Sequence, residues 1–515
     1  MNLPRFVEEE FEASLRCGWL AGGFARFRCG DCGSDRPARC ARYGRYGFWY
    51  PRGMLPTRRT VIRALAAGLV LPAFDCGGTQ RVNGAGLRVI VVGAGAAGLS
   101  VTQTLLDSGF EVVLLEASDR VCGRVRTLNG FADFPIELGA EEIHGTRSEW
   151  YDLASANGAV FVSGRTTDYY CVDGRLGSED DVWDADFRAA ESLVEDLWRW
   201  DGGETPMDEV AAEARIPRRT WRTLDAWLGN EYGTSTPRLG AASLASSEND
   251  RSSGNGGRRR AGGGRGDHGA VDHDKLALAN SYEDLLRASF PAAVALARTG
   301  VPVRRIEWDT DEVLVTTASG VERGAAVVIT VPLTILKSGA ISMALPPDKQ
   351  AAIETIGMGA GMKVILKFRR AFWGDGVGSI YGGPKVAEYW ATMEGRGTTP
   401  VLTAFVMGSD AEALRASGDR VAAVLGDLDI LYDGAATPAF DDAVVMDWTD
   451  EPYIGGAYSF PSPGSDAARE VLAAPIGGRV FFAGEATHTE GHFATVHGAI
   501  ETGLRAAREV ARLTR

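Results

Sequence analysis

The clearest pattern of apolar and polar positions begins at residue 87. The run 87–92 is apolar, rich in β-branched residues and closed by a glycine, which is typical of a strand buried on both faces. A helical pattern extends to residue 108, and a second apolar run, 111–115, follows it. The order strand, helix, strand predicts a parallel βαβ unit and places the sequence in the α/β class.

The loop between this strand and this helix carries glycines at the spacing Gly-x-Gly-x-x-Gly. Gly93 makes the tight turn, Gly95 lets the backbone approach a pyrophosphate, and Gly98 lets the helix pack close to the strand. The unpaired N–H groups at the start of the helix would face that pyrophosphate. Glu116 ends the second strand, where its carboxylate can accept hydrogen bonds from both ribose hydroxyls. The sequence therefore predicts a site for FAD or NAD rather than NADP; the alternative is a glycine-rich turn in an ordinary βαβ unit.

Further patterns continue along the chain. Residues 148–232 alternate between tryptophan-bearing helical patterns and loops, which predicts part of a second domain. Strand signals follow at residues 301–308, 312–317, 325–332, 362–368 and 480–483. In the fourth of these runs the alternation puts Lys363 and Lys367 on one face of the strand.

Length and charge narrow the function. The chain has 515 residues, enough for two or three domains, and a formal net charge of −14. This charge disfavours nucleic-acid or anionic-membrane binding as the main role. No apolar run reaches the roughly 18 residues that a membrane span needs, so no transmembrane segment is expected. Residues 241–275 are Arg/Gly-rich and predict a low-complexity loop; on an acidic protein we favour a solvated loop over a nucleic-acid arm.

The first 83 residues differ from the rest. Residues 1–53 are rich in Arg, Gly and Cys without periodicity, which predicts a disordered arm or an extension that is not translated; their cysteines could supply a zinc set, but we predict no metal site. After Met54, twin arginines precede a short apolar run, which is typical of a twin-arginine export signal and linker over residues 54–83. Translation from Met54 would place the protein in the periplasm or otherwise outside the cytoplasm, with Cys76 as a candidate lipid anchor; without this signal a cytoplasmic location is expected.

Residues 116–127 narrow the choice of cofactor. Their sequence, Glu-Ala-Ser-Asp-Arg-Val-Cys-Gly-Arg-Val-Arg-Thr, resembles the segment that follows the ribose acid in the flavin-dependent amine oxidase family. That family includes monoamine oxidases, polyamine oxidases and flavin histone demethylases, and we expect a bacterial member of it. Further resemblance lies in residues 135–145, 362–373, 448–459 and 480–499. The family usually has a glycine where this chain has Cys122, and we expect this cysteine to crowd the loop.

The resemblance implies a two-domain flavoprotein. A Rossmann-like FAD-binding domain would be assembled from residues 84–147, 291–345 and 451–515, and an α+β substrate domain from residues 148–290 and 346–450. FAD is expected to be non-covalent, because Ala457 stands where monoamine oxidases have the cysteine that attaches FAD.

The resemblance also implies the residues of the site. Those expected to contact FAD are Gly93, Gly95, Ala97, Gly98, Glu116, Arg124, Gly139, Ala140, Val303, Glu485, Thr495 and Val496. Those expected to act on the substrate are His144, Lys363, Trp390, Tyr453 and Tyr458. Lys363 would hold a water against flavin N5, and partial burial would disfavour its charged form so that it can share a proton with that water. The two tyrosines would stand face to face in front of the flavin and guide the amine to it.

The implied reaction is oxidation of a small amine, either a primary amine or a polyamine, to an imine, with dioxygen reduced to hydrogen peroxide. Two alternatives stay open at this point. One is a related flavoenzyme, such as an L-amino-acid oxidase or a desaturase, and the other is a non-catalytic flavin-binding protein. The sequence predicts neither the particular amine nor the oligomeric state.

Overall fold

The computed structural model describes residues 26–29, 46–49, 86–146, 148–162, 166–246, 275–465 and 467–514. The chain divides into two units, Met1–Arg81 and Val82–Arg515. In the first unit, β1 (Arg26–Cys29) and β2 (Tyr46–Trp49) pair in antiparallel fashion. The predicted export signal, Cys76 and most of the predicted arm lie outside the described residues and stay predictions.

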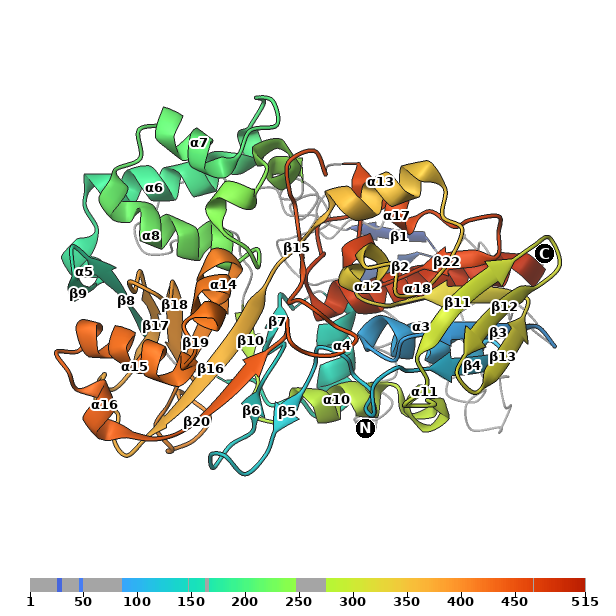
Figure 1. Ribbon diagram of the computed structural model, residues 1–515, viewed down its shortest axis with the longest axis horizontal. Helices are drawn as coiled ribbons and strands as arrows, with labels where there is room; N and C mark the ends of the chain where they lie inside the picture. The colour runs from blue at the N-terminus through green and yellow to red at the C-terminus, as the bar shows by residue number, and fades with distance from the viewer. Residues whose placement is uncertain are drawn as a thin grey trace. The chain divides into compact units, whose positions relative to one another are not determined.

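The predicted βαβ unit forms one half of a parallel sheet in the second unit (Figure 1). The sheet has the order β22-β14-β3-β4, with strands at Val480–Phe482, Ala326–Ile329, Arg88–Val92 and Glu111–Leu115. All three strand pairs are parallel. Their apolar runs are buried almost completely, as a strand covered on both faces requires. Three segments that are far apart in the sequence therefore make one sheet.

The first and last helices of the second unit lie side by side on one face of this sheet (Figure 1). They are α3 (Ala96–Asp107) and α18 (Val496–Val510). Ser100 Oγ donates a hydrogen bond to Ile500 O at 3.0 Å. A Cβ on Gly503 would lie 2.6 Å from Ala97 O, so glycine is what lets the two helices approach this closely. The other face of the sheet is covered by β11 (Val303–Trp308), β12 (Val313–Thr317) and β13 (Gly320–Gly324).

The second layer is a seven-stranded sheet with the order β20-β16-β19-β18-β17-β8-β9. Its strands are Phe440–Asp447, Gly361–Phe368, Val401–Met407, Glu388–Ala391, Val377–Tyr381, Thr167–Val172 and Arg175–Ser178. The sheet is antiparallel except between β17 and β8. On β16, Leu366 packs in a core with helices α14 (Gly408–Ala416) and α15 (Arg420–Leu431). Ile365 packs on the opposite face against Leu138 and Trp448. Both faces of β16 are thus covered.

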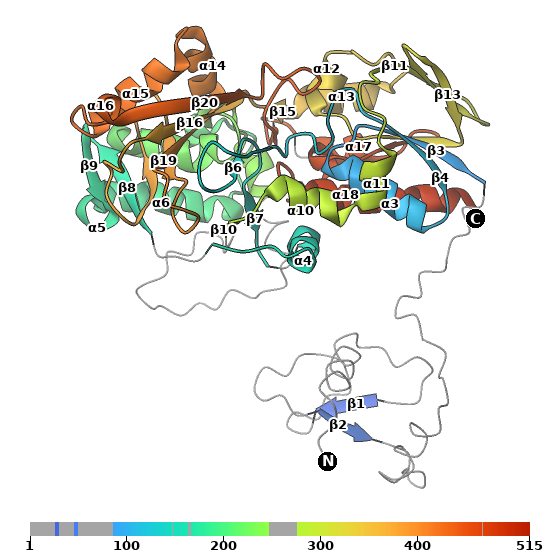
Figure 2. The ribbon, with the colours of Figure 1, turned by 90° about the horizontal axis from the view of Figure 1, so that it is seen from below.

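Short elements complete the second unit (Figure 2). The helices are α4 (Glu149–Ala156), α5 (Glu179–Val182), α6 (Ala185–Asp196), α7 (Met207–Glu213), α8 (Trp221–Leu224), α10 (Tyr282–Ser289), α11 (Pro291–Leu296), α12 (Leu333–Lys337), α13 (Pro347–Thr355), α14 (Gly408–Ala416), α15 (Arg420–Leu431), α16 (Ala436–Ala439) and α17 (Ala468–Ala473). The short strands are β5 (Thr127–Leu128), β6 (Ile136–Glu137), β7 (Glu142–His144), β10 (Lys275–Ala277), β15 (Gly357–Met358) and β21 (Ser459–Phe460).

The structure changes one predicted boundary and agrees with the predicted fold class. Residues 241–246 are helical, with Ala241 and Leu244 fully buried, so the low-complexity loop begins later than residue 241. Among the described residues, no helix combines the length and the apolar character needed to cross a membrane. A mixed α/β fold with a parallel sheet built from separated segments is confirmed.

Candidate active site

One cavity of about 1010 Å³ is lined by residues of both sheets. All of the predicted cofactor and substrate residues line it except Gly98. The N-termini of α3 and α18 both reach its wall, through Gly95 and Thr495. The structure thus brings together residues that lie up to 400 positions apart in the chain.

The glycine loop shapes the wall beside α3. Gly93 has a φ of +105°, a conformation that favours glycine, and a Cβ on Gly98 would lie 1.9 Å from Gly93 O. Gly98 therefore packs the helix against the turn and stays behind the cavity. A Cβ on Gly95 would meet only Gly123 Cα, at 4.0 Å, so a side chain there would project into the cavity. No side chain caps the N-terminus of α3, and its first turn holds no acidic residue, so its N–H groups can bind an anion.

Glu116 is held at the end of β4 as the sequence predicted. Its Oε2 accepts a hydrogen bond from the backbone N–H of Ala94 at 2.7 Å. Its Oε1 accepts from the N–H and the hydroxyl of Ser118, at 2.9 and 2.8 Å. Oε2 therefore keeps further acceptor capacity for a ribose hydroxyl.

Arg124 and Glu485 bind each other across the cavity wall. Arg124 donates to Glu485 Oε1 at 3.0 Å and to Ala457 O at 2.6 Å. Burial alone would raise the pKa of Glu485, but the charge of Arg124 and the hydrogen bond from Ser459 outweigh it and lower the pKa. Glu485 also accepts a hydrogen bond from the backbone N–H of Ala494. It therefore connects the turn before α18 to Arg124.

Two positions in the same wall show why small or flexible residues matter there. A Cβ on Gly139 would lie 1.9 Å from Arg124 O, so this glycine allows the close approach of another part of the chain rather than of a cofactor alone. Cys122 has a φ of +77° and is 1% exposed. A left-handed conformation costs a non-glycine residue about 1 kcal/mol, which explains the glycine that the family usually has at this place. Cys122 was expected to crowd this loop, and the structure shows that its effect is strain in the backbone at its own positive φ.

The buried lysine has charged partners that the sequence did not indicate. Lys363 lies on β16 and is 3% exposed. Its Nζ donates to Glu141 Oε2 at 2.7 Å and to Glu137 O at 3.1 Å. Arg396 binds the other oxygen of Glu141. Burial alone would raise the pKa of Glu141, but the charges of Lys363 and Arg396 outweigh it and lower the pKa to about 2. On the sequence alone, burial is expected to disfavour the charged form of Lys363. The carboxylate of Glu141, which stabilises that form, was not foreseen.

The aromatic residues lie in different surroundings. Trp390 is half-buried, packs on Phe405, and has Lys363 Nζ at 5.1 Å from its ring centroid. The hydroxyl of Tyr458 donates to the backbone carbonyls of residues 230 and 231. Tyr453 is 47% exposed. Both tyrosines line the cavity, and their face-to-face arrangement stays a prediction.

Two further cavity residues, His492 and His497, escaped the sequence reasoning. His144 lies 6.0 Å from His497, measured between ring centroids, and His497 lies 4.5 Å from His492. All three line the cavity. The sequence did contain a signal for a histidine cluster, because residues 488–497 hold three of the six histidines of the chain. The partners Glu141 and Arg396 had no such signal, since 255 positions separate them.

The chain resembles a known protein family and several solved structures. The family described as flavin containing amine oxidoreductase matches residues 96–225 and 237–511, well over half of the chain. The chain belongs to this family. Among relatives of this chain, polyamine oxidase 2 of Arabidopsis thaliana is 29% identical over 472 residues, covering 84% of this chain and 89% of that protein.

Other relatives of this amine oxidoreductase are much longer. Lysine-specific histone demethylase 1 homolog 3 of Arabidopsis thaliana is 28% identical over 493 residues, covering 82% of this chain and 30% of that protein. Against lysine-specific histone demethylase 1B of Mus musculus the identity is 29% and the covered share of that protein is 52%. The chain therefore spans about a third to a half of the length of the histone demethylases it matches.

Solved structures agree on the fold. Cyclohexylamine oxidase from Brevibacterium oxydans IH-35A superposes with a TM-score of 0.71 at 21% identity, covering 83% of this chain and 100% of that one. A putrescine oxidase bound to putrescine gives 0.70 at 18% identity, covering 82% and 98%. This similarity establishes the flavin amine oxidase fold.

The cofactor is FAD, bound without a covalent link. The residues present fit it. The cavity is long enough to touch two helix N-termini, Gly95 leaves space that a side chain would fill, and Glu116 presents acceptors at the end of β4. Ala457 provides no sulfur for attachment. The individual cofactor contacts stay predictions.

Proposed function

We propose that this protein oxidises a primary amine or a polyamine to an imine and reduces dioxygen to hydrogen peroxide. The observation that supports this function best is the negative charge of one cavity wall, which the seven-stranded sheet and residue 231 form. Asp168, Glu231 and Glu388 lie on this wall. Among the described residues that contribute to it, Lys363 is the only basic one, and Glu141 already balances its charge. Such a wall suits a cationic amine and disfavours the carboxylate of an amino acid.

The residues around Lys363 are suited to orienting the reactants. When bound, FAD accepts a hydride from the carbon beside the amine nitrogen and passes two electrons to dioxygen. Lys363 Nζ has three hydrogens, and Glu141 and the carbonyl of Glu137 take two of them. The third is available to a water in the cavity. The face of Trp390, beside this lysine, contributes an apolar surface for the alkyl part of the amine.

An amine panel tests this function. The purified full chain, supplied with FAD, would be assayed for peroxide with monoamines, diamines, polyamines, a methyl-lysine peptide and L-amino acids. We expect turnover with at least one simple amine or polyamine and none with amino acids. Turnover with amino acids alone would contradict the proposal, and a yellow protein without turnover would favour the non-catalytic alternative.

Export and origin are separate proposals. We infer a bacterial source and twin-arginine export when translation starts at Met54, because twin arginines and a short apolar run follow it. Residues 54–83 fused to a reporter should reach the periplasm of a bacterial host and fail to do so in a strain without the twin-arginine translocase. Equal export in both strains would contradict the proposal.

A further inference from the structure

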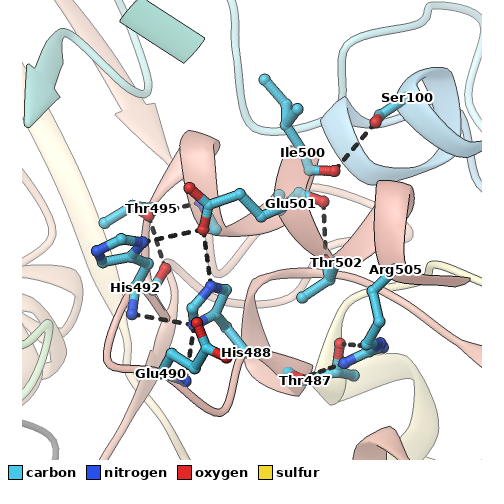
Figure 3. A network of polar contacts seen from close by, with 12 residues as sticks. Ser100, Thr487, His488, Glu490, His492, Thr495, Ile500, Glu501, Thr502 and Arg505 are labelled. Atoms are coloured by element: carbon cyan, nitrogen blue, oxygen red, sulfur yellow. Dashed lines mark hydrogen bonds and ion pairs between the residues drawn. The ribbon is translucent and has the colours of Figure 1, made fainter. Parts of the chain in front are cut away.

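Four histidines gather beside the cavity near the turn that leads into α18. Figure 3 shows two of them, His488 and His492, with Glu501. The ring centroids of His144 and His497 are 6.0 Å apart, those of His497 and His492 are 4.5 Å apart, and those of His492 and His488 are 5.0 Å apart. Glu501, on α18, lies between the last two rings. Because His144, His492 and His497 line the active-site cavity, the cluster reaches the space where the substrate reacts.

Hydrogen bonds fix the protonation of His488. Its Nδ1 accepts the backbone N–H groups of Glu490 and His492, both at 3.1 Å. A ring nitrogen that accepts two N–H bonds carries no proton, so the proton of neutral His488 is on Nε2. This Nε2–H donates to Glu501 Oε2 at 2.8 Å. Burial lowers the pKa of His488, which keeps the ring neutral.

The same carboxylate oxygen orients His492. Nδ1 of His492 lies 2.9 Å from Glu501 Oε2. Burial alone would raise the pKa of Glu501, but its hydrogen bonds with His488 and His492 outweigh it and lower the pKa to about 2. Since Glu501 is an anion that accepts from Nδ1–H, the basic nitrogen of His492 is Nε2. The side chain of His492 is 31% exposed and that of His488 only 7%, so His492 is the member of the pair that can meet a ligand.

A metal ion is the main alternative occupant of this cluster. The ligand atoms of His488, His492 and Glu501 all lie within 4.8 Å of one another. A metal bound to Nε2 of His488 would require the proton on Nδ1, where metal-bound histidines normally donate to an acceptor. Here two N–H donors face Nδ1 instead. The backbone therefore opposes metal binding and favours the hydrogen-bonded triad.

We propose that His492 is the base that takes a proton from the ammonium group of the substrate, and that Glu501 and His488 position it. This inference rests on the proposed oxidation of amines. Near neutral pH an alkyl amine is almost entirely an ammonium ion, since its pKa is about 10, whereas hydride leaves only the carbon beside a neutral nitrogen. In the step, an N–H bond of the ammonium breaks, its electron pair stays on nitrogen, and the proton bonds to Nε2 of His492.

The surroundings of His492 suit this role. His492 packs against His488 on its own turn and His497 on α18, and it binds Glu501 on the same helix. Two further titratable groups lie beside these rings: His144 on β7 beside His497, and Glu490 beside His488. Burial lowers the pKa of His497 well below its ordinary value, so this neighbour stays neutral. The anion Glu501 stabilises the imidazolium that forms. The proton is used again later, because dioxygen needs a proton besides the hydride equivalent to become hydrogen peroxide.

Flavin reduction in the absence of oxygen tests the base. In His492→Gln we expect the flavin absorbance of the wild type and a rate of reduction by a primary amine that is about 100-fold lower near neutral pH. The defect should vanish above about pH 10, where the amine is already neutral. An equal defect at all pH values, or loss of FAD from the variant, would overturn the proposal.

The pH profile tests the positioning residue. In Glu501→Gln the imidazolium loses its anion, so the acid limb of flavin reduction should move to lower pH by about one unit. The control is Glu490→Gln, which removes a charge from an exposed side chain of the same turn and should leave the profile unchanged. An unmoved limb in Glu501→Gln would overturn the positioning role. Chelators should not change the wild-type rate, and a loss of rate on chelation would overturn the triad in favour of a metal.

A measurement without turnover separates this proposal from the proposed function. A tertiary-alkyl amine has no hydrogen on the reacting carbon, so it can bind without being oxidised. With 15N-histidine-labelled protein, its binding near neutral pH should protonate one histidine, and the changed signal should be missing in His492→Gln. Protonation without oxidation of any amine would refute the proposed function alone. If no histidine becomes protonated when the tertiary-alkyl amine binds, the role of His492 as the base is refuted, whether or not other amines are oxidised.

Discussion

The two walls of the active-site cavity are built in different ways. The wall on the parallel sheet presents backbone groups: the glycine loop, the N-terminus of α3 and the N-terminus of α18. The wall on the seven-stranded sheet presents side chains, and its centre is the buried pair of Lys363 and Glu141. Backbone groups need only a local conformation, whereas the buried pair needs two segments 222 positions apart to meet. Outside its glycines, Glu116 and the pair of Arg124 and Glu485, the first wall should therefore tolerate substitutions, and the second should fail when one charge is removed.

The largest expected effect is on stability, from Glu141→Gln. This change leaves Lys363 and Arg396 buried without their anion, which should lower the free energy of unfolding by about 3–5 kcal/mol. Thermal or urea unfolding followed by circular dichroism measures it. Glu149→Gln, at an exposed position on α4, is the control and should change stability by less than about 0.5 kcal/mol. Equal stability of both variants would contradict the importance of the pair.

The next effect is on catalysis, from Lys363→Met. The variant loses the donor that faces the cavity, so flavin reduction or reoxidation should slow by about 100-fold while FAD stays bound. Lys367→Met is the matched control on the same strand, because its ammonium pairs with Asp441 and Asp442 at the surface and lies over the ring of Phe131. Stopped-flow absorbance follows both half-reactions. Unchanged rates in Lys363→Met would remove this lysine from the mechanism.

A smaller effect is expected on the backbone wall, from Gly95→Val. Its side chain would enter the space beside Gly123, so the affinity for FAD should fall about tenfold or more, equivalent to about 1.4 kcal/mol. Gly426→Ala, in open space on α15, is the control and should leave FAD binding unchanged. Titration of the apoprotein with FAD gives both affinities. Normal affinity in Gly95→Val would mean that the pyrophosphate does not pass this loop.

The last effect, on the pH dependence of stability, concerns Glu137, behind the lysine. Burial raises the pKa of Glu137 from its ordinary 4.5 to about 7. Between these values the folded protein binds the proton more tightly than the unfolded chain does, so stability falls as the pH rises through this window. Glu137→Gln cannot ionise and should lose this pH dependence. Unfolding midpoints of both proteins between about pH 5 and 8 test it, and parallel curves would contradict it.

The backbone wall was also the part that the sequence could predict. The spacing of Gly93, Gly95 and Gly98 and the acid at Glu116 encode a local conformation, and all of them lie where the pattern indicated. Gly98 packs the helix against the turn, as the pattern predicted, but it does not line the cavity where a contact with FAD was expected.

The side-chain wall was harder to predict, because its contacts depend on how distant segments fold together. Lys363 was found through a family resemblance, but its partners Glu141 and Arg396 were not, since no local pattern links them. The strain at Cys122 was also partly foreseen as crowding, although its cause is the sign of φ. Burial of a charge indicates that a partner exists, and only the fold shows which one it is.

Release of the cofactor tests most directly whether the two ends of the second unit close around one non-covalent FAD. Purified full-length protein would be denatured in acid, the polypeptide removed, and the supernatant analysed by chromatography and mass spectrometry. We predict a yellow protein that releases intact FAD in about equimolar amount and leaves a colourless polypeptide. Protein that stays colourless when supplied with FAD, or flavin that remains attached to the polypeptide, would contradict the structure proposed for this site.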